Sequence, residues 1–109
     1  MSWKVVYYQT RGGKETVREF IDFQPNKKRA KIVWMIELLK KHGKVLPKTY
    51  LKRLVGSKNL WELKSGFYRI FLSFLQEKNI LFIHAIIKKT QKTPKKDIKL
   101  AIKRLNEYL

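Results

Sequence analysis

The sequence has no cysteine, and only 8 of its 109 residues are acidic. Without cysteine, the chain can form neither a disulfide scaffold nor a thiolate metal site. The opening stretch MSWKVVYYQTRGGK lacks the long apolar core of a signal peptide, and no run approaches the length of a membrane span. We therefore expect a soluble cytoplasmic protein with no membrane partner.

Motifs for several kinds of chemistry are absent as well. No spacing of histidine and carboxylate residues is typical of a metal site. No glycine-rich phosphate loop, nucleotide fingerprint or Ser/His/Asp set occurs. We expect a protein that uses neither a metal nor a cofactor.

Positive charge is what the chain has in excess. Its 26 lysines and arginines stand against 8 acids, which gives a net charge of +18. Such an imbalance destabilises the compact state by self-repulsion and favours polyanionic partners, chiefly nucleic acid or an acidic protein. The apolar fraction of 44% is ordinary for a globular protein. A chain of this length builds one core, so we expect a single domain over residues 1–109.

Three strand-like runs lie between Leu60 and Lys88, separated by Gly66 and by the turn QEKN. They are short, rich in large apolar residues and bounded by turn residues, which predicts an antiparallel meander. Because side chains alternate across a strand, one face is predicted to be apolar, with Trp61, Leu63, Tyr68, Ile70, Leu72, Phe74, Leu81, Ile83, Ala85 and Ile87. The opposite face gathers Glu62, Lys64, Arg69, Ser73, His84 and Lys88, mixed with Phe71, Phe82 and Ile86.

The polar face of this meander is where we expect chemistry, because it keeps much polarity inside apolar strands. The alternative is a solvated sheet face, since antiparallel sheets often leave one side wet. A charge on an open face contributes little to folding, so replacing Arg69 by alanine is expected to leave the stability near its original value.

One strand and two helices are predicted before the meander. Trp3–Tyr8 has the composition of an opening strand. Apolar spacing predicts helices over 15–22 and from Pro25 to about His42, which together form a hairpin packed on the sheet. The run Ile32–Ile36 is apolar all round, which predicts that the second helix is covered on more than one side.

A loop region and a last helix complete the predicted fold. Residues 44–59 read as a loop that includes either a short strand or one helical turn. Thr93 is expected to cap the last helix, with Pro94 as its first residue. The fold class is therefore α+β, with a small, mostly antiparallel sheet, an N-terminal helical hairpin and a C-terminal helix.

Four stretches occur together at a distinctive spacing: LWELK at 60–64, Gly66 followed by Tyr68–Ile70, the apolar strand through His84, and KKTQKTP at 88–94. With them the chain resembles the RelE/ParE toxin superfamily and, within it, the HigB-like, phage-derived branch. The resemblance covers nearly the whole chain and implies a RelE-like fold and a toxin of a type II toxin–antitoxin system. RelE-like members cut messenger RNA on the ribosome and ParE-like members poison DNA gyrase; this chain is more similar to the RNA-cutting side.

The resemblance also implies partners. The substrate would be messenger RNA on the ribosome, and HigB-like systems have an antitoxin with a helix-turn-helix domain. Because the chain carries a charge of +18, we expect the docking segment of the antitoxin to be acidic. That segment is expected to cover either the basic face near Arg69 and Lys88 or the helix hairpin.

Arg69 and Glu62 are the first candidates for catalysis. Metal-free cleavage of RNA needs a 2′-hydroxyl to attack its own phosphate while the protein orients the attack and stabilises the added charge. Arginine suits that charge because its planar fork donates two parallel hydrogen bonds to phosphate. The resemblance matches Arg69 to the family's transition-state arginine. The alternative for Arg69 is an ion pair with Glu62 across the hairpin, and Glu62 either acts as a base or orients Arg69.

Lysines after the meander are the next candidates. Within a cluster of like charges the pKa of a lysine falls, so a neutral amine of Lys88 or Lys89 can act as a general base. The alternative is a solvated basic loop that only holds phosphate. The residues expected to bind RNA are Lys64, Tyr68, Lys92, Lys95 and Lys96.

The two histidines suggest a two-histidine ribonuclease, but each has a structural alternative. His42 ends a predicted helix, where an imidazolium interacts favourably with the macrodipole. His84 is lone, and a strand histidine with a structural partner is the alternative. Three functions therefore remain open: a ribosome-dependent endoribonuclease, a gyrase-poisoning toxin, and a non-enzymatic basic protein that binds nucleic acid.

Overall fold

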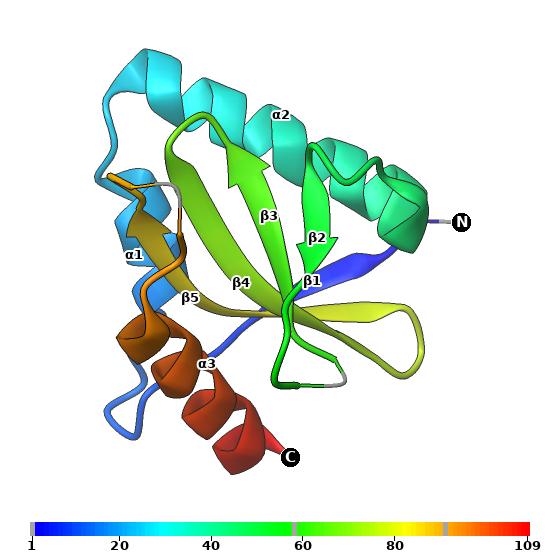
Figure 1. Ribbon diagram of the computed structural model, residues 1–109, viewed down its shortest axis with the longest axis vertical. Coiled ribbons are helices and arrows are strands. Elements are labelled where there is room, and N and C mark those ends of the chain that lie inside the picture. The colour runs from blue at the N-terminus through cyan, green and yellow to red at the C-terminus, as the bar shows by residue number, and fades with distance from the viewer. Residues whose placement is uncertain (1, 58, 91) are drawn as a thin grey trace.

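The computed structural model describes residues 2–57, 59–90 and 92–109 (Figure 1). The elements in chain order are β1 (Lys4–Tyr7), α1 (Thr16–Asp22), α2 (Asn26–His42), a 3-10 turn η1 (Gly43–Val45), β2 (Leu51–Arg53), β3 (Trp61–Ser65), β4 (Tyr68–Leu75), β5 (Asn79–Ile87) and α3 (Lys95–Tyr108). The predicted opening strand, meander and last helix are confirmed. The region 44–59, which the sequence left open, contributes the short strand β2.

The strands form one five-stranded sheet in the order β1-β5-β4-β3-β2. Strands β3, β4 and β5 form the predicted antiparallel meander, and β2 pairs antiparallel with β3. The first strand pairs parallel to the last, with Val5 opposite Ile80. The short strands β1 and β2 are therefore the two edges, and the candidate residues Glu62 and Arg69 come from the interior strands β3 and β4.

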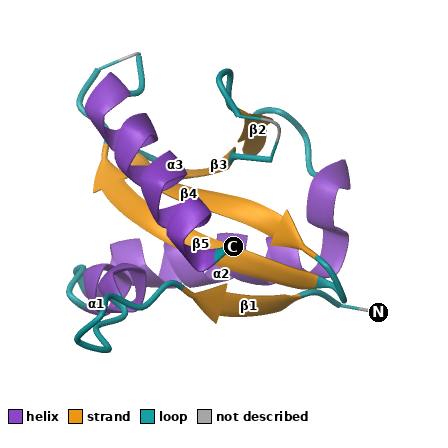
Figure 2. Ribbon diagram, turned by 90° about the horizontal axis from the view of Figure 1, so that it is seen from below, coloured by secondary structure: helices purple, strands orange, loops and turns teal. Residues whose placement is uncertain are grey.

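Helices cover both faces of the sheet: α1 and α2 lie on one side and α3 on the other (Figure 2). The core on the α1/α2 face consists of Val17, Ile21, Ile32, Met35, Ile36, Leu39, Leu51, Leu63, Tyr68, Ile70, Leu72, Phe74, Ile80, Phe82 and Ala85. The core on the α3 face is smaller and consists of Tyr8, Leu54, Leu60, Phe71, Leu81, Ile83, Ala101 and Leu105. The predicted polar face is thus partly covered by a helix and is not an open, solvated surface.

A bulge in β5 overturns part of the predicted face assignment. Phe71 pairs with His84, whereas the next residue, Leu72, pairs with Phe82, so that Ile83 is the extra residue of the bulge. A bulge reverses the alternation of side chains beyond it. As a result Leu81 and Ile83 pack on the α3 face and Phe82 on the α1/α2 face, the reverse of the prediction. The freed carbonyl of Ile83 accepts a hydrogen bond from Arg104 Nη1 of α3 at 3.1 Å.

The prediction that α2 is covered on more than one side is wrong. Ile32, Met35 and Ile36 are buried, but Val33 is 45% and Trp34 is 60% exposed. The buried residues follow the i, i+3, i+4 spacing of a single face. The helix therefore packs on the sheet with one face only, although its run Ile32–Ile36 is apolar all round.

The end of α2 is fixed by a glycine that no other residue can replace without movement. Gly43 follows the helix with φ +59°, in the region that favours glycine. A Cβ at this position would collide with the indole nitrogen of Trp3, which lies just before β1. The close approach of α2 to the start of β1 is also marked by a backbone hydrogen bond of 2.8 Å from Trp3 N–H to the carbonyl of Lys40. Within the described ranges, the molecule contains no helix both long enough and apolar enough to cross a membrane.

Candidate functional site

Glu62 and Arg69 form an ion pair on the α3 face. In the ladder between β3 and β4, Lys64 pairs with Arg69 and Glu62 with Phe71, so Glu62 and Arg69 are diagonal neighbours on one face. Arg69 Nε lies 2.8 Å from Glu62 Oε1, and the side chains are 13% and 1% exposed. The N–H is not aligned with the oxygen, and neither atom has a hydrogen-bond partner among the described residues. The contact is therefore a buried electrostatic pair.

The end of the Arg69 side chain is held at the β3–β4 turn. Its Nη1 donates to the carbonyl of Gly66 at 2.6 Å and to its neighbour Tyr68 at 2.9 Å. No hydrogen bond of the described residues uses the other terminal nitrogen, Nη2. Anchoring at Nε and Nη1 fixes the guanidinium plane and leaves Nη2 available to an anion.

Thr93 holds the second oxygen of Glu62, which corrects the prediction that it caps α3. Its hydroxyl donates to Glu62 Oε2 at 2.9 Å. The N-cap position belongs to Pro94, and no side chain caps the helix. With one oxygen facing Arg69 and the other bound to Thr93, the buried Glu62 carboxylate is fixed in place. This geometry favours the prediction that Glu62 orients Arg69 over the alternative that it acts as a base.

His84 makes a second polar link between the sheet and α3. Its Nε2 lies 2.8 Å from Oδ1 of Asp97 in the first turn of α3. The imidazole stacks on Phe71, with ring centroids 5.6 Å apart and an interplanar angle of 12°. His84 is thus a strand histidine with a structural partner, the alternative that the sequence left open. Together with Thr93–Glu62, it ties the start of α3 to the sheet.

Lys88 follows the end of β5 and is the lysine whose proton affinity the fold changes most clearly. Burial lowers the pKa of Lys88 from the usual 10.5. The negative charge of Glu62 opposes this shift, and the positive charges of Arg69, Lys64 and Lys52 add to it. The like-charge cluster predicted from the sequence is present, but burial has the larger influence on this pKa.

A hollow of about 290 Å³ joins Arg69 to the basic loop. It is lined by Gly66, Phe67, Arg69, Lys88, Lys89 and Thr90. The backbone N–H of Lys88 donates to the carbonyl of Phe67 at 2.6 Å, which fixes the loop against the β3–β4 turn. The ring of Phe67 is 69% exposed at the rim. The hollow brings together the arginine and two lysines that were predicted to be catalytic.

The remaining predicted residues fall into two groups. Lys92, Lys95 and Lys96 are exposed before and at the start of α3, and Lys64 lies beside Arg69 in the ladder. Tyr68, by contrast, is 8% exposed in the α1/α2 core, and its hydroxyl donates to Gln24 Oε1 at 2.8 Å. Because side chains alternate along β4, Tyr68 and Arg69 lie on opposite faces of the sheet. This geometry does not support the expected contact of Tyr68 with RNA.

Nothing in the sequence pointed directly to Thr93 and Asp97 as partners of the strand residues. Asp97 carried a weak signal, because it is one of 8 acids and stands in a helix rich in lysine. The bond of Thr93 to Glu62 had no signal in the sequence, since a threonine that precedes a proline and a helix is predicted to be the N-cap of that helix. Among the described residues, no group of three or more histidine, cysteine or acidic residues could hold a metal ion.

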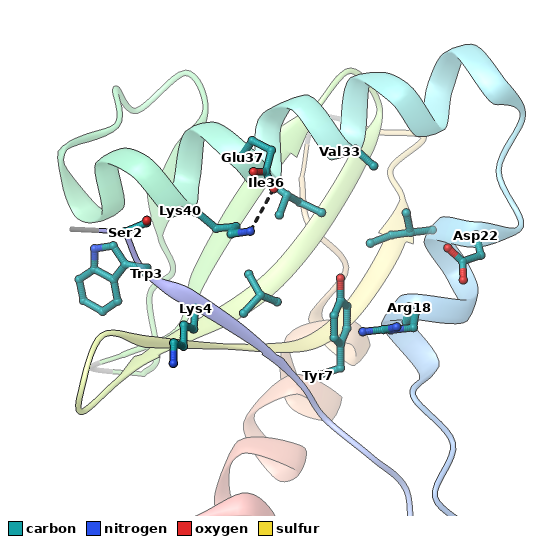
Figure 3. Close-up of a pocket in the computed structure, with 12 residues that line it drawn as sticks. Ser2, Trp3, Lys4, Tyr7, Arg18, Asp22, Val33, Ile36, Glu37 and Lys40 are labelled. Carbon is teal, nitrogen blue, oxygen red and sulfur yellow. Dashed lines mark hydrogen bonds and ion pairs between the residues drawn. The ribbon is translucent and has the colours of Figure 1, made fainter.

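Another hollow, of about 760 Å³, lies away from Arg69, between β1, α1 and α2 (Figure 3). Its lining mixes both signs of charge: Arg18 lies 4.7 Å from the centre of the Tyr7 ring, and Lys40 Nζ pairs with Glu37 at 3.2 Å. Asp22 also lines it. With two carboxylates in its wall, this groove suits a polyanion less well than the hollow at Arg69 does.

The fold is that of RelE in two solved toxin–antitoxin complexes. The crystal structure of the archaeal RelE–RelB complex from Pyrococcus horikoshii OT3 matches with a TM-score of 0.64 at 16% identity, over 82% of this chain and 98% of that one. The RelB–RelE antitoxin–toxin complex from Methanococcus jannaschii matches with a TM-score of 0.56 at 19% identity, over 74% of this chain and 96% of that one. At such identities the likeness establishes the fold alone.

The family is established by sequence. Residues 19–106 match the family described as "Phage derived protein Gp49-like (DUF891)", so the chain belongs to this family. No curated protein matches the chain.

Proposed function

We propose that this chain is the toxin of a type II toxin–antitoxin system, of the HigB-like kind, and that it cleaves messenger RNA on the ribosome without a metal. The Gp49-like family and the RelE fold support the toxin class. The observation that carries the proposal is the Arg69 guanidinium, anchored through Nε and Nη1 in a hollow that it shares with two lysines.

The proposed reaction is attack by a 2′-hydroxyl on the adjacent phosphorus. The 2′-oxygen forms a bond to phosphorus, the bond from phosphorus to the 5′-oxygen breaks, and a 2′,3′-cyclic phosphate is left. Arg69 stabilises the charge that accumulates on the phosphate oxygens, which is worth about 100- to 1000-fold in rate for a well-placed donor. Its free Nη2 is the edge that meets the phosphate.

Two lysines in the same hollow serve the proton transfers. The lowered pKa of Lys88, caused first by burial, raises the fraction of neutral amine that can accept the proton of the 2′-hydroxyl. Lys89 is exposed beside it and, as an ammonium, supplies a proton to the leaving 5′-oxygen. Glu62 holds Arg69 in position and does not take part in proton transfer.

Other lysines around the hollow hold the rest of the RNA. Lys64, Lys92, Lys95 and Lys96 provide charge for flanking phosphates or for the ribosome. The proposed antitoxin carries a helix-turn-helix domain and an acidic docking segment, which neutralises part of the net charge of +18. The association rate of the two proteins is expected to fall with ionic strength, because opposite charges steer their encounter.

The test uses the purified chain with programmed ribosomes carrying a defined message. Primer extension should locate a cut in the ribosome-bound message, and the 5′ fragment should end in a 2′,3′-cyclic phosphate. A message with a single 2′-O-methyl nucleotide at the cut position should resist cleavage there. A 5′-phosphate product would contradict this mechanism. An intact message that is tightly bound would favour the non-enzymatic binder, and loss of gyrase supercoiling activity would favour the gyrase poison.

A further inference from the structure

A second hollow lies between the β3–β4 turn and the middle of α2, and its wall includes Trp34 and Met35 of that helix. Figure 1 shows the β3–β4 turn beside α2. This hollow measures about 520 Å³ and shares Gly66 and Arg69 with the hollow at Lys88. Its remaining wall includes Trp34 of α2, Tyr50 and the side of β3 at Lys64. The two hollows therefore meet at the arginine that is proposed to hold the reacting phosphate.

Trp34 and Tyr50 are two large side chains exposed at this hollow. Trp34 is 60% and Tyr50 is 40% exposed. The other two tryptophans of the chain pack edge-on against Phe74, Trp3 at 5.0 Å and Trp61 at 5.4 Å between ring centroids. Among the described residues, Trp34 makes no such aromatic contact. Its indole adds little to the core, so its presence on the surface points to a role in binding.

Hydrogen bonds of the main chain hold the backbone at Trp34 and Tyr50, and the charged side chains among the described residues that line the hollow are all basic. The carbonyl of Tyr50 accepts a hydrogen bond of 2.8 Å from the backbone N–H of Lys64, and Trp34 stands on the third turn of a 17-residue helix. Lys31, Lys64 and Arg69 line the hollow, and none of its described lining residues is acidic. The groove beside β1, in contrast, includes Asp22 and Glu37.

Aromatic rings set among basic residues are the means by which proteins hold single-stranded nucleic acid: the bases stack on the rings and the cations bind the phosphates. We infer that the hollow at Trp34 and Tyr50 is a base-stacking subsite for an unpaired nucleotide next to the phosphate held by Arg69. This inference rests on the proposed function. It adds that the substrate is single-stranded at that nucleotide and that a base, as well as the phosphate backbone, contributes to affinity.

The test compares two RNA-like probes of equal charge. One is a 2′-O-methyl hexanucleotide, which cannot be cleaved because it lacks the nucleophilic hydroxyl. The other has the same phosphates with abasic spacers in place of every base. Binding is measured by anisotropy for the wild-type chain, Trp34→Ala, Tyr50→Ala and Trp34→Phe. Phe23→Ala is the control, because Phe23 is an aromatic residue that is 90% exposed and lines neither hollow.

For the wild type we expect tighter binding of the probe with bases. Trp34→Ala and Tyr50→Ala should each weaken it by roughly tenfold or more. Binding of the abasic probe should stay the same in all variants, and Trp34→Phe should recover most of the loss. Phe23→Ala should bind both probes as the wild type does.

Several results would overturn the inference. One is equal affinity of the wild type for the two probes; another is wild-type affinity of Trp34→Ala and Tyr50→Ala for the probe with bases. A third is loss of co-purification with the antitoxin in Trp34→Ala with RNA binding unchanged, which would make the hollow a protein-docking site. Failure of the proposed function would look different, since the wild-type chain would then leave ribosome-bound messages intact.

Discussion

The two faces of the sheet differ in the side chains that they bury. On the α1/α2 face, helices seal the strands with apolar side chains such as Leu39 and Phe82, both fully buried. On the α3 face the apolar core is smaller, and the buried residues include the charged Glu62 and the polar Ser73. A buried ion pair is weak support for stability, because desolvation offsets the attraction. The comparison teaches that the first face holds the fold together, while the second uses part of that stability to position Arg69.

Among the variants that test this difference between the two faces, Arg69→Ala should have the largest effect. The sequence alone suggested little change in stability because it placed Arg69 on an open sheet face, but in the structure Glu62 is 1% exposed and would lose its counter-ion. Breaking a buried pair by removing one partner costs about 3–5 kcal/mol. Denaturant unfolding should show this loss in Arg69→Ala.

The double variant Arg69→Ala with Glu62→Gln separates the two contributions. It should regain much of the stability, since no uncompensated charge remains buried, yet stay inactive. Lys64→Ala, which removes a neighbouring cation from the same ladder, serves as the control and should unfold much as the wild type does. Unchanged stability of Arg69→Ala would show that the pair is solvated.

Leu39→Ala tests the opposite face. Leu39 is fully buried against the sheet, and removing such a side chain costs about 2–5 kcal/mol through lost transfer energy and the cavity left behind. Thermal unfolding should show the loss. The rate of RNA cleavage per folded molecule should be unchanged, because Leu39 belongs to the core of the α1/α2 face, whereas Arg69 and Glu62 form their ion pair on the α3 face. A fall in that rate at a temperature where the variant is folded would mean that the faces are coupled.

Thr93→Val should have a smaller effect on stability and a specific effect on the site. The hydroxyl of Thr93 donates to Glu62 Oε2 at 2.9 Å, and a hydrogen bond to a charged group contributes about 1.5–3 kcal/mol. Valine keeps the shape but leaves the carboxylate oxygen unpaired. Thr93→Ser keeps the hydroxyl and should preserve both stability and cleavage. Equal stability and equal cleavage rates of the valine and serine variants would show that the hydroxyl of Thr93 does not hold Glu62 in place.

The smallest effect concerns pH. Burial lowers the pKa of Lys88 from 10.5, so the cleavage rate should rise by about tenfold per pH unit and level off before that value. In Lys88→Arg, whose charge is fixed, the rising limb should be absent. The pKa of Lys88 also affects the free energy of unfolding. Between the lowered pKa and 10.5, Lys88 binds more protons in the unfolded chain than in the folded one. The stability of the wild type should therefore rise with pH relative to that of Lys88→Met. An identical pH profile in Lys88→Arg would assign the limb to another group.

Much of the fold followed from local pattern, because the strands and helices are strongly periodic. The pairing of Glu62 with Arg69 followed as well, since both lie in regular parts of β3 and β4 where alternation holds. The bulge at Ile83 could not be predicted, because it depends on the hydrogen-bonding register between strands. The partner of Thr93 depends on the distance between β3 and α3, which lie far apart along the chain.

The exposure of Trp34 could not be predicted either. A helical run that is apolar on all sides predicts burial on all sides. Whether this happens depends on how many other elements pack on α2, and its exposed Trp34 lies on a side that no element of the described residues covers. The candidate catalytic residues were chosen by residue type, position and family resemblance, whereas the contacts between them needed the structure. The lowered pKa of Lys88 favours it as the candidate base, and the bond from Thr93 favours an orienting role for Glu62.

The central claim, that Arg69 on the α3 face carries the chemistry while the α1/α2 face carries the fold, is tested most directly by one rate. That rate is cleavage of a ribosome-bound message by Arg69→Ala and by Leu39→Ala, each at a temperature where circular dichroism shows it folded. The account predicts a loss of about 100- to 1000-fold for Arg69→Ala and the wild-type rate for Leu39→Ala. Cleavage by folded Arg69→Ala at the wild-type rate would contradict it.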